Sequence, residues 1–466
     1  MNKLTPALVL LPLLWGCTLV PAFQHPAPPI HAQWPQFSPS SSPTEGLSAS
    51  EMAWTDFFQS EPLQEVIRTA LIHNRDWRMA VLNVKAAQAL YQVEKADQWP
   101  SIDAGASAER VGVTRAQNGG GSRSISSSYS ANVAITAFEL DLFGRISSQN
   151  EAALQRYFST VAAQDAARIS LIAEVANTYL QWLADRKILA LVEETLKTQS
   201  QTYELIRQSY ERGAASKLDV SQIHMAVETA RANHALYNRQ VLQTGNALKQ
   251  LMGTTTLSAE GHPTLESVSL TTVLPVGLPS EVLLQRPDIR QAEHALQAAH
   301  ADIGVARAAF FPQISLTAGL GFASPQLSNL FSSQGSGAWR FIPQFNLPLF
   351  DNGSNQANLE YSQTSEEILI AAYEKAIQNA FREVADALAA RYTLENELSA
   401  QRDLVAASQE AYDLSFARYK GGIDSFLNVL DAQRSLFAAQ QRYITVEKQR
   451  LANQVTFYKS LGGGLK

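Results

Sequence analysis

The chain has 466 residues, enough for two or three ordinary domains, and its net charge of −6 gives an isoelectric point near 5.8. This balance excludes a typical nucleic-acid-binding protein, which needs a basic surface to displace cations from phosphates. No run of about 18 apolar residues follows the N-terminal segment, which excludes a polytopic helical membrane protein.

The N-terminal segment has the features of an export signal. Residues 1–16 contain Lys3 and an apolar run, and a small residue precedes Cys17, which is typical of a secretory signal peptide. Leu14-Trp15-Gly16-Cys17 resembles a bacterial lipobox, in which the cysteine becomes the lipidated first residue of the mature protein. A plain signal peptide with an incidental thiol is the alternative. Since Cys17 is the only cysteine, no disulfide framework is expected.

Residues 17–50 are predicted to form a lipidated tether. Seven prolines lie between Cys17 and Pro43 among Ser, Gln and Ala. This composition favours an extended chain over a packed element. The rest of the protein would therefore be tethered near a membrane surface.

The body of the chain contains an internal repeat with a period close to 210 residues. Chance similarity between alanine-rich helices would not preserve the order of proline, aromatic and glycine landmarks. The sequence therefore predicts a duplication, with a first repeat at 51–253, an irregular equatorial segment at 254–286 and a second repeat at 287–466. The landmarks recur as follows: Pro100 as Pro312, Phe138–Phe143 as Phe345–Phe350, and Tyr210, Gly213 and Ser216 as Tyr419, Gly422 and Ser425.

Alternation of apolar and polar residues predicts a pair of strands in each repeat. In the second repeat Ile314, Leu316 and Leu320 share one parity, and small or polar residues occupy the other. In the first repeat the alternation changes phase just before Phe138. The predicted strands span residues 101–114, 126–143, 312–324 and 338–350.

Beyond each strand pair the apolar period becomes helical. Ile370, Ile377, Val384 and Leu398 lie at multiples of seven residues, which predicts a narrow seam like that of a coiled coil. Residues 145–212 contain neither proline nor glycine, so one helix of about 68 residues could extend roughly 100 Å. Such a rod has no core of its own and needs neighbours along its length.

Four strands are too few to close a membrane barrel within one chain. A sheet exposed to lipid must close on itself, and bacterial barrels begin at about eight strands. Either the sheet lies outside a membrane, or several chains each contribute four strands to one barrel. The long helices favour the second interpretation because they also need other chains beside them.

Several motifs taken together resemble those of one protein family. The motifs are the lipobox, FELDLFGR at 138–145, LQRPDIR at 284–290, AAFFP at 308–312, PLFD at 348–351 and LDAQRSL at 430–436. Essentially from Cys17 onward, the chain is similar to the outer-membrane efflux lipoproteins of the TolC, OprM and NodT type. The resemblance implies a mixed α and β, TolC-like homotrimer, with four strands per protomer in a 12-stranded transmembrane β-barrel continuous with a long periplasmic α-helical barrel.

The implied function is a passive channel in the outer membrane of a Gram-negative cell, lipid-anchored through Cys17 and extending into the periplasm. It would export small molecules such as drugs and toxic compounds. Its partners would be a periplasmic membrane-fusion adaptor and an inner-membrane pump of the RND type, or of the ABC or MFS type. Metal-ion or protein export by the same fold remains open. The alternative from another class is a periplasmic coiled-coil adaptor or scaffold lipoprotein.

The resemblance also indicates functional positions. Pro100 and Pro312 would lie at helix-to-strand junctions, where a residue without a backbone donor is easily placed. Some family members carry an arginine where this chain has Asp424, so an ion pair from that position is not implied here. The helix turns that would dock the adaptor contain Gly213, Ser216, Gly421, Gly422 and Ser425, and the periplasmic gate maps onto Tyr419, Leu427, Asp431 and Arg434.

Three copies of Asp431 around one axis would repel one another and would need positive charges to compensate for this repulsion. At a separation of about 6 Å and an effective dielectric constant near 20, each pair repels by roughly 3 kcal/mol. Arg434 lies one helical turn further along, and Lys420 and bound cations are the other candidates. Leu427 would add an apolar collar.

Catalytic motifs are absent from the sequence. None of the eight histidines forms an i, i+4 pair, so no metal site is expected. The glycine run at 119–121 lacks the Lys-Ser/Thr sequel of a phosphate-binding loop, and no Gly-x-Ser-x-Gly motif occurs. We expect neither enzymatic activity nor a cofactor.

Overall fold

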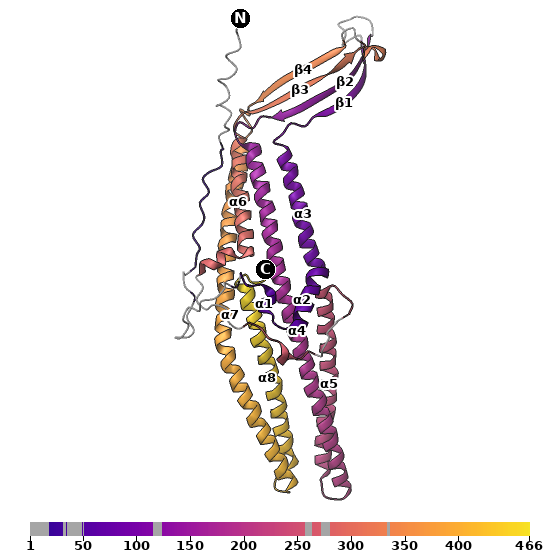
Figure 1. Cartoon of the computed structure of the whole chain (residues 1–466), viewed down its shortest axis with the longest axis vertical. Helices are drawn as coiled ribbons and strands as arrows, with labels where there is room; N and C mark the ends of the chain where they lie inside the picture. The colour runs from indigo at the N-terminus through magenta and orange to yellow at the C-terminus, as the bar shows by residue number, and fades with distance from the viewer. Residues whose placement is uncertain are drawn as a thin grey trace. The chain divides into compact units, whose positions relative to one another are not determined.

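The computed structural model describes residues 18–30, 34, 49, 51–114, 124–256, 263–271, 280–332 and 336–466. The predicted signal peptide, Cys17 and most of the predicted tether lie outside the described residues. The chain divides into two compact units, and Figure 1 labels the helices and strands that they contain. Unit 1 takes its described residues from 1–27, 84–161 and 291–373, and unit 2 takes them from 28–83, 162–290 and 374–466.

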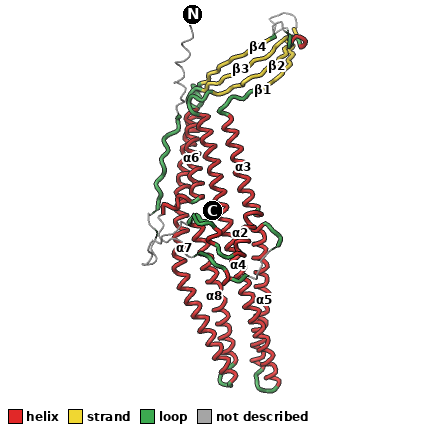
Figure 2. The backbone as a smooth tube through the Cα atoms, in the orientation of Figure 1, coloured by secondary structure: helices red, strands yellow, loops and turns green. Residues whose placement is uncertain are grey.

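Unit 1 contains one antiparallel sheet of four strands in the order β1-β2-β3-β4 (Figure 2). The outer strands β1 and β4 each pair on one side only among the described residues, which leave the other edge of each strand open. The strands are β1 (Asp103–Val113), β2 (Ser124–Glu139), β3 (Gln313–Ser324) and β4 (Gly337–Asn346).

A β-bulge explains the phase change seen in the sequence of β2. The register with β3 shifts between Ile135 and Phe138, and Ala137 between them has a positive φ of 52°. An extra residue at a bulge turns the following side chains to the opposite face. The alternation in the sequence therefore marks a real irregularity of the ladder.

Two strands end earlier than the alternation predicts. β2 ends at Glu139, not at residue 143, and β4 ends at Asn346, not at residue 350. After β2, the carboxylate of Asp141 accepts the backbone N–H groups of Ile146 (3.1 Å) and Ser147 (2.7 Å) at the start of the next helix. Asp351 similarly accepts the N–H of Asn355 (2.8 Å). Asp141 and Asp351 thus cap the helices that follow, whose first N–H groups otherwise lack partners.

The six longest helices of the described residues form three pairs of nearly equal length. α3 and α6 precede β1 and β3 and have 22 residues each, whereas α4 and α7 follow β2 and β4 and have 67 each. The returning helices α5 and α8 have 36 and 35 residues. None of the helices in the described part of the chain combines enough length and hydrophobicity to cross a membrane. The bounds are α3 (Arg75–Ala96), α4 (Arg145–Glu211), α5 (Lys217–Met252), α6 (Pro287–Ala308), α7 (Ser354–Lys420) and α8 (Phe426–Ser460).

The N-terminal segment of unit 1 packs along α6. Arg307 donates to the backbone carbonyl of Leu19 (3.2 Å), and a Cβ at Gly304 would overlap the side chain of Val20. Both ring nitrogens of the buried His300 face oxygen atoms, one of Glu366 (2.5 Å) and one of the Pro21 carbonyl (2.8 Å).

The core of unit 2 includes short elements from both ends of the chain. Phe57 stacks on Tyr458 with ring centroids 4.0 Å apart, and the Tyr458 hydroxyl donates to the Met52 carbonyl (2.7 Å). Phe58 pairs with Leu270 in an isolated bridge. Within 254–286 the described residues contain two short helices, η2 (Leu265–Ser267) and η3 (Ser280–Gln285), besides this bridge. The short helices near the N-terminal end are α1 (Trp54–Phe57) and α2 (Glu61–His73).

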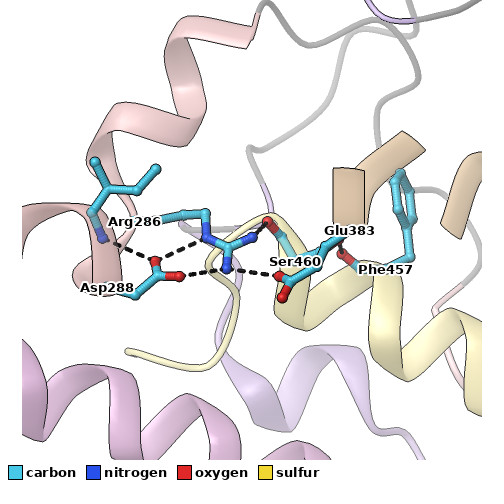
Figure 3. Close-up of polar contacts among 6 residues, drawn as sticks. Arg286, Asp288, Glu383, Phe457 and Ser460 are labelled. Carbon is cyan, nitrogen blue, oxygen red and sulfur yellow. Dashed lines mark hydrogen bonds and ion pairs between the residues drawn. The ribbon is translucent and has the colours of Figure 1, made fainter. Parts of the chain in front are cut away.

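A buried arginine joins three parts of unit 2 (Figure 3). Arg286 donates two hydrogen bonds to Asp288 (3.0 and 2.7 Å), one to Glu383 (2.9 Å) and one to the backbone carbonyl of Ser460 (2.7 Å). Burial disfavours its charge, but the hydrogen bonds and charges of Asp288 and Glu383 outweigh burial and raise the pKa of Arg286. The guanidinium therefore stays charged and holds the start of α6, α7 and the end of α8 together.

Candidate gate at the helical tip

Two tight turns end the paired helices of unit 2. Gly213 joins α4 to α5 with φ 76°, and Gly422 joins α7 to α8 with φ 70°. The N–H of Gly213 donates to the carbonyl of Tyr210, and that of Gly422 donates to the carbonyl of Tyr419, both at 2.9 Å. A Cβ would meet nothing within 4 Å at either glycine. Glycine is therefore favoured by the left-handed backbone and not by lack of space.

The two turns are stabilised differently. In the first, Ser216 and Asp219 form a reciprocal capping box, with distances of 3.1 and 3.0 Å between side chain and backbone. In the second, the Ser425 side chain makes no capping bond. There Arg418 forms an ion pair with Asp424, with N–O distances of 2.5 and 3.1 Å. Asp424 thus has an ion-pair partner within its own chain, which the family resemblance did not imply.

The pKa of Asp424 provides a test of this ion pair. The hydrogen bond and charge of Arg418 lower the pKa of the Asp424 carboxyl. Arg418→Gln should therefore raise the pKa of Asp424 towards its ordinary value, measured by NMR titration of the solubilised protein. A lowered carboxylate pKa stabilises the turn above the unfolded-state pKa, and this contribution is lost as the pH falls through the folded-state pKa. An unchanged pKa in the variant would contradict the ion pair.

Next to the turns, one apolar cluster joins the two helical hairpins. Tyr419 packs against it, with its ring centroid 5.1 Å from that of Phe426. Burial, together with the charge of Asp219, raises the pKa of the Tyr419 hydroxyl, so it stays neutral. The cluster consists of Ile206 from α4, Val220 and Ile223 from α5, and Phe426, Val429 and Leu430 from α8.

The other three predicted gate residues lie on the exposed part of α8. Leu427 is 44% exposed, and the side chains of Asp431 and Arg434 are 62% and 71% exposed. Asp431 and Arg434 form an ion pair at 3.4 Å. Lys420, the other candidate partner, lies instead over the ring of Phe416 at 4.5 Å. The predicted gate positions therefore divide into one inward tyrosine and one exposed group of leucine, aspartate and arginine.

The predicted junction residues lie between helices and strands. Pro100 falls between the end of α3 and the start of β1, and Pro312 falls between α6 and β3. Among the described residues, no group of three or more His, Cys, Asp or Glu side chains is arranged to hold a metal ion. Sequence reasoning did not identify Arg418 as a partner of Asp424, because their spacing of six residues becomes a contact only through the turn.

Comparison with known proteins settles the family. The outer membrane efflux protein family matches residues 66–254 and 278–463. The chain belongs to this family. It is 48% identical over 454 residues to two Pseudomonas putida proteins, the antibiotic efflux pump outer membrane protein ArpC and the toluene efflux pump outer membrane protein TtgC. Each alignment covers 97% of this chain and 93% of the relative.

A solved channel structure shows the same fold. The open state of the MtrE outer membrane channel of Neisseria gonorrhoeae superposes with a TM-score of 0.86 at 38% identity, covering 97% of this chain and 99% of that one. The family resemblance and the mixed helix-and-strand, TolC-like fold predicted from the motifs are therefore confirmed. This efflux protein is an outer-membrane channel component of an efflux pump.

Proposed function

We propose that three copies of this efflux protein form a passive duct across the outer membrane that exports small molecules. The duct would be anchored by a lipid on Cys17, reach into the periplasm, and dock to an adaptor and an energised inner-membrane pump. The observation that carries the proposal is the unpaired surface of the single chain, which exposes both edges of its sheet and an apolar helix face.

The sheet supports closure by neighbouring copies. Trp339, Phe341 and Phe345 share one face of β4 and are 78%, 60% and 63% exposed. Large aromatic side chains on one face suit contact with lipid. A sheet in lipid cannot leave its edges unpaired. Placing β4 of one copy beside β1 of the next in three copies closes a 12-stranded barrel.

Helix α3 supports the same assembly. No residue of α3 is buried in the single chain, although Met79, Leu82, Leu90 and Val93 are apolar and between 49% and 67% exposed. A helix with exposed apolar residues gains stability when a neighbour covers them. A second copy of the chain is the neighbour that a closed ring supplies.

The matched elements support the proposed duplication. The equal lengths of α3 and α6 and of α4 and α7, the two glycine turns and the two separate family matches favour repeats at 51–253 and 287–466 around the segment 254–286. Each repeat then contributes one strand pair and one helical hairpin. The two hairpins place Gly213, Ser216, Gly421, Gly422 and Ser425 at the tips that would contact the adaptor.

Small organic molecules are the proposed cargo. Two relatives at 48% identity are named for the efflux of antibiotics and of toluene. The described residues contain no metal-ligand cluster that would favour metal-ion export. Energy and most of the choice of substrate would come from an RND-type pump, or from an ABC or MFS pump, because a passive duct supplies neither.

The barrel can be tested with a charge on either face of β4. Phe341→Arg places a charge on the proposed lipid face, where an arginine costs roughly 2–4 kcal/mol near the bilayer midplane. We expect a severalfold lower yield of heat-modifiable trimer on gels, together with fewer conducting channels in planar bilayers. Ile342→Arg is the matched control, because Ile342 shares the opposite parity with Arg340 and Gln344.

The control should assemble nearly as well as the unmodified protein. Equal behaviour of the two variants would contradict the lipid-facing assignment of the aromatic side chains. A monomeric, non-conducting unmodified protein would overturn the duct itself.

A further inference from the structure

A cavity of about 300 Å³ lies within unit 2 between α4, α5 and α8, farther along these helices from the turns than the apolar cluster. Its lining includes Gln199 from α4, Met225 and Thr229 from α5, and Leu430 and Phe437 from α8. Small-molecule pockets range from roughly 300 to 1,000 Å³. This cavity therefore fits a ligand of about one ring.

Gln199 lines the cavity, and its side-chain amide must rotate to present its oxygen to a ligand there. The residue is only 9% exposed, and its side-chain oxygen is buried without a hydrogen-bond donor. The nearby hydroxyls of Thr195 and Thr229 donate to the backbone carbonyls of their own helices, at 2.8 Å each. A buried acceptor without a donor is unfavourable. A ligand that brings one O–H group would relieve this deficit.

The rest of the lining combines the side-chain amides of Gln222, Asn233 and Gln433 with an apolar part that suits an uncharged aromatic ring. The ring of Phe437, the thioether of Met225 and the side chain of Leu430 offer apolar contacts, and sulfur and ring edges attract one another. Arg434 is the one charged residue among the described lining residues, and it already pairs with Asp431. An anionic ligand would have to compete with that carboxylate.

We propose that this cavity binds a small uncharged aromatic alcohol, with phenol as the simplest example. Its ring packs against Phe437, Leu430 and Met225, and its hydroxyl donates to the side-chain oxygen of Gln199 after a small rotation of the amide. The ligand touches both helical hairpins, so it stabilises the arrangement seen here by mass action. If this arrangement is the closed gate proposed above, the bound ligand also lowers the conductance of the channel. This second effect rests on the proposed function, whereas the binding itself does not.

Phenol and toluene provide a matched pair of probes. They carry either an O–H or a methyl group on the same ring. Because toluene leaves water more readily than phenol, each affinity is first corrected for the probe's partition between water and an apolar solvent. Binding to the full chain in detergent is measured by ligand-observed NMR, with partition into micelles cancelled by comparing variants. We expect the corrected affinity of phenol to exceed that of toluene roughly three- to tenfold.

Three variants locate the site. Gln199→Leu should abolish the preference for phenol while toluene still binds. Thr229→Trp, at the exposed mouth of the cavity, should remove binding of both probes. Gln201→Leu changes an exposed glutamine of α4 outside the lining and should behave like the unmodified protein.

Specific outcomes would overturn the proposal. If Gln199→Leu keeps the preference for phenol, the proposed hydrogen bond is wrong. If Thr229→Trp binds both probes as before, the cavity holds only water and the probes bind elsewhere. If phenol binds as proposed but conductance does not fall, the site stands and the proposed gate fails.

Discussion

Replacing both Leu427 and Asp431 by alanine is expected to raise the single-channel conductance severalfold in planar bilayers. Leu427 and Asp431 project from the exposed part of α8, where three copies would narrow one axis. In the proposed gate, removing the leucine would widen an apolar constriction, and removing the aspartate breaks the 3.4 Å ion pair with Arg434. Both changes would weaken the proposed closed arrangement of the tip.

A matched pair of substitutions controls for changes elsewhere on the helices. Leu404→Ala combined with Asp403→Ala also removes one exposed leucine and one exposed aspartate, but from α7 well before the turn. This control should conduct like the unmodified channel. A gate variant with unchanged conductance would count against the gate, and an equal rise in the control would show that the effect is not local to the tip.

Replacing Arg286 by methionine is expected to lower the free energy of unfolding by roughly 2–3 kcal/mol. Removing one partner of a fully buried ion pair costs about 3–5 kcal/mol. The cost here is smaller because the side chains of Asp288 and Glu383 are each 42% exposed and water can replace part of the lost interaction. The Ser460 carbonyl also loses its donor.

This change in the free energy of unfolding is measured by denaturant unfolding of the solubilised full chain, with circular dichroism as the signal. Arg286→Lys keeps the charge but cannot reproduce the two parallel bonds to Asp288, so an intermediate loss is expected. Arg382→Met on the exposed face of α7 is the control and should stay within about 0.5 kcal/mol of the unmodified protein. If Arg286→Met matches that control, the network contributes little stability.

The sequence predicts local elements better than it predicts contacts between distant residues. The absence of proline and glycine from 145–212 predicts one long helix, and α4 spans Arg145–Glu211. Glycine predicts a turn because its backbone tolerates a positive φ, and Gly213 and Gly422 adopt one. These properties depend on a few neighbouring residues, so sequence alone contains them.

The ion pairs required the three-dimensional structure. Arg286 contacts the Ser460 carbonyl across 174 positions of sequence, and no periodicity relates two such residues. The sequence predicted that the charge of Asp431 needs a positive partner. The side-chain conformations in the structure were needed to show that Arg434 is this partner and that Lys420 lies over Phe416 instead. The cavity beside Gln199 also escaped prediction, since it depends on how three helices pack.

The pairing of β2 with β3 has a consequence for the order of folding. Each helical hairpin closes through a local turn, whereas the β2–β3 ladder joins Tyr129 to Ser324 and Phe138 to Leu316. Contacts between residues far apart in sequence form slowly because a long loop must close first. The hairpins should therefore form while the chain is still in water, and the sheet should form last. Until the sheet forms, its aromatic side chains and unpaired strands stay exposed, so this interval is when the chain is most prone to aggregation.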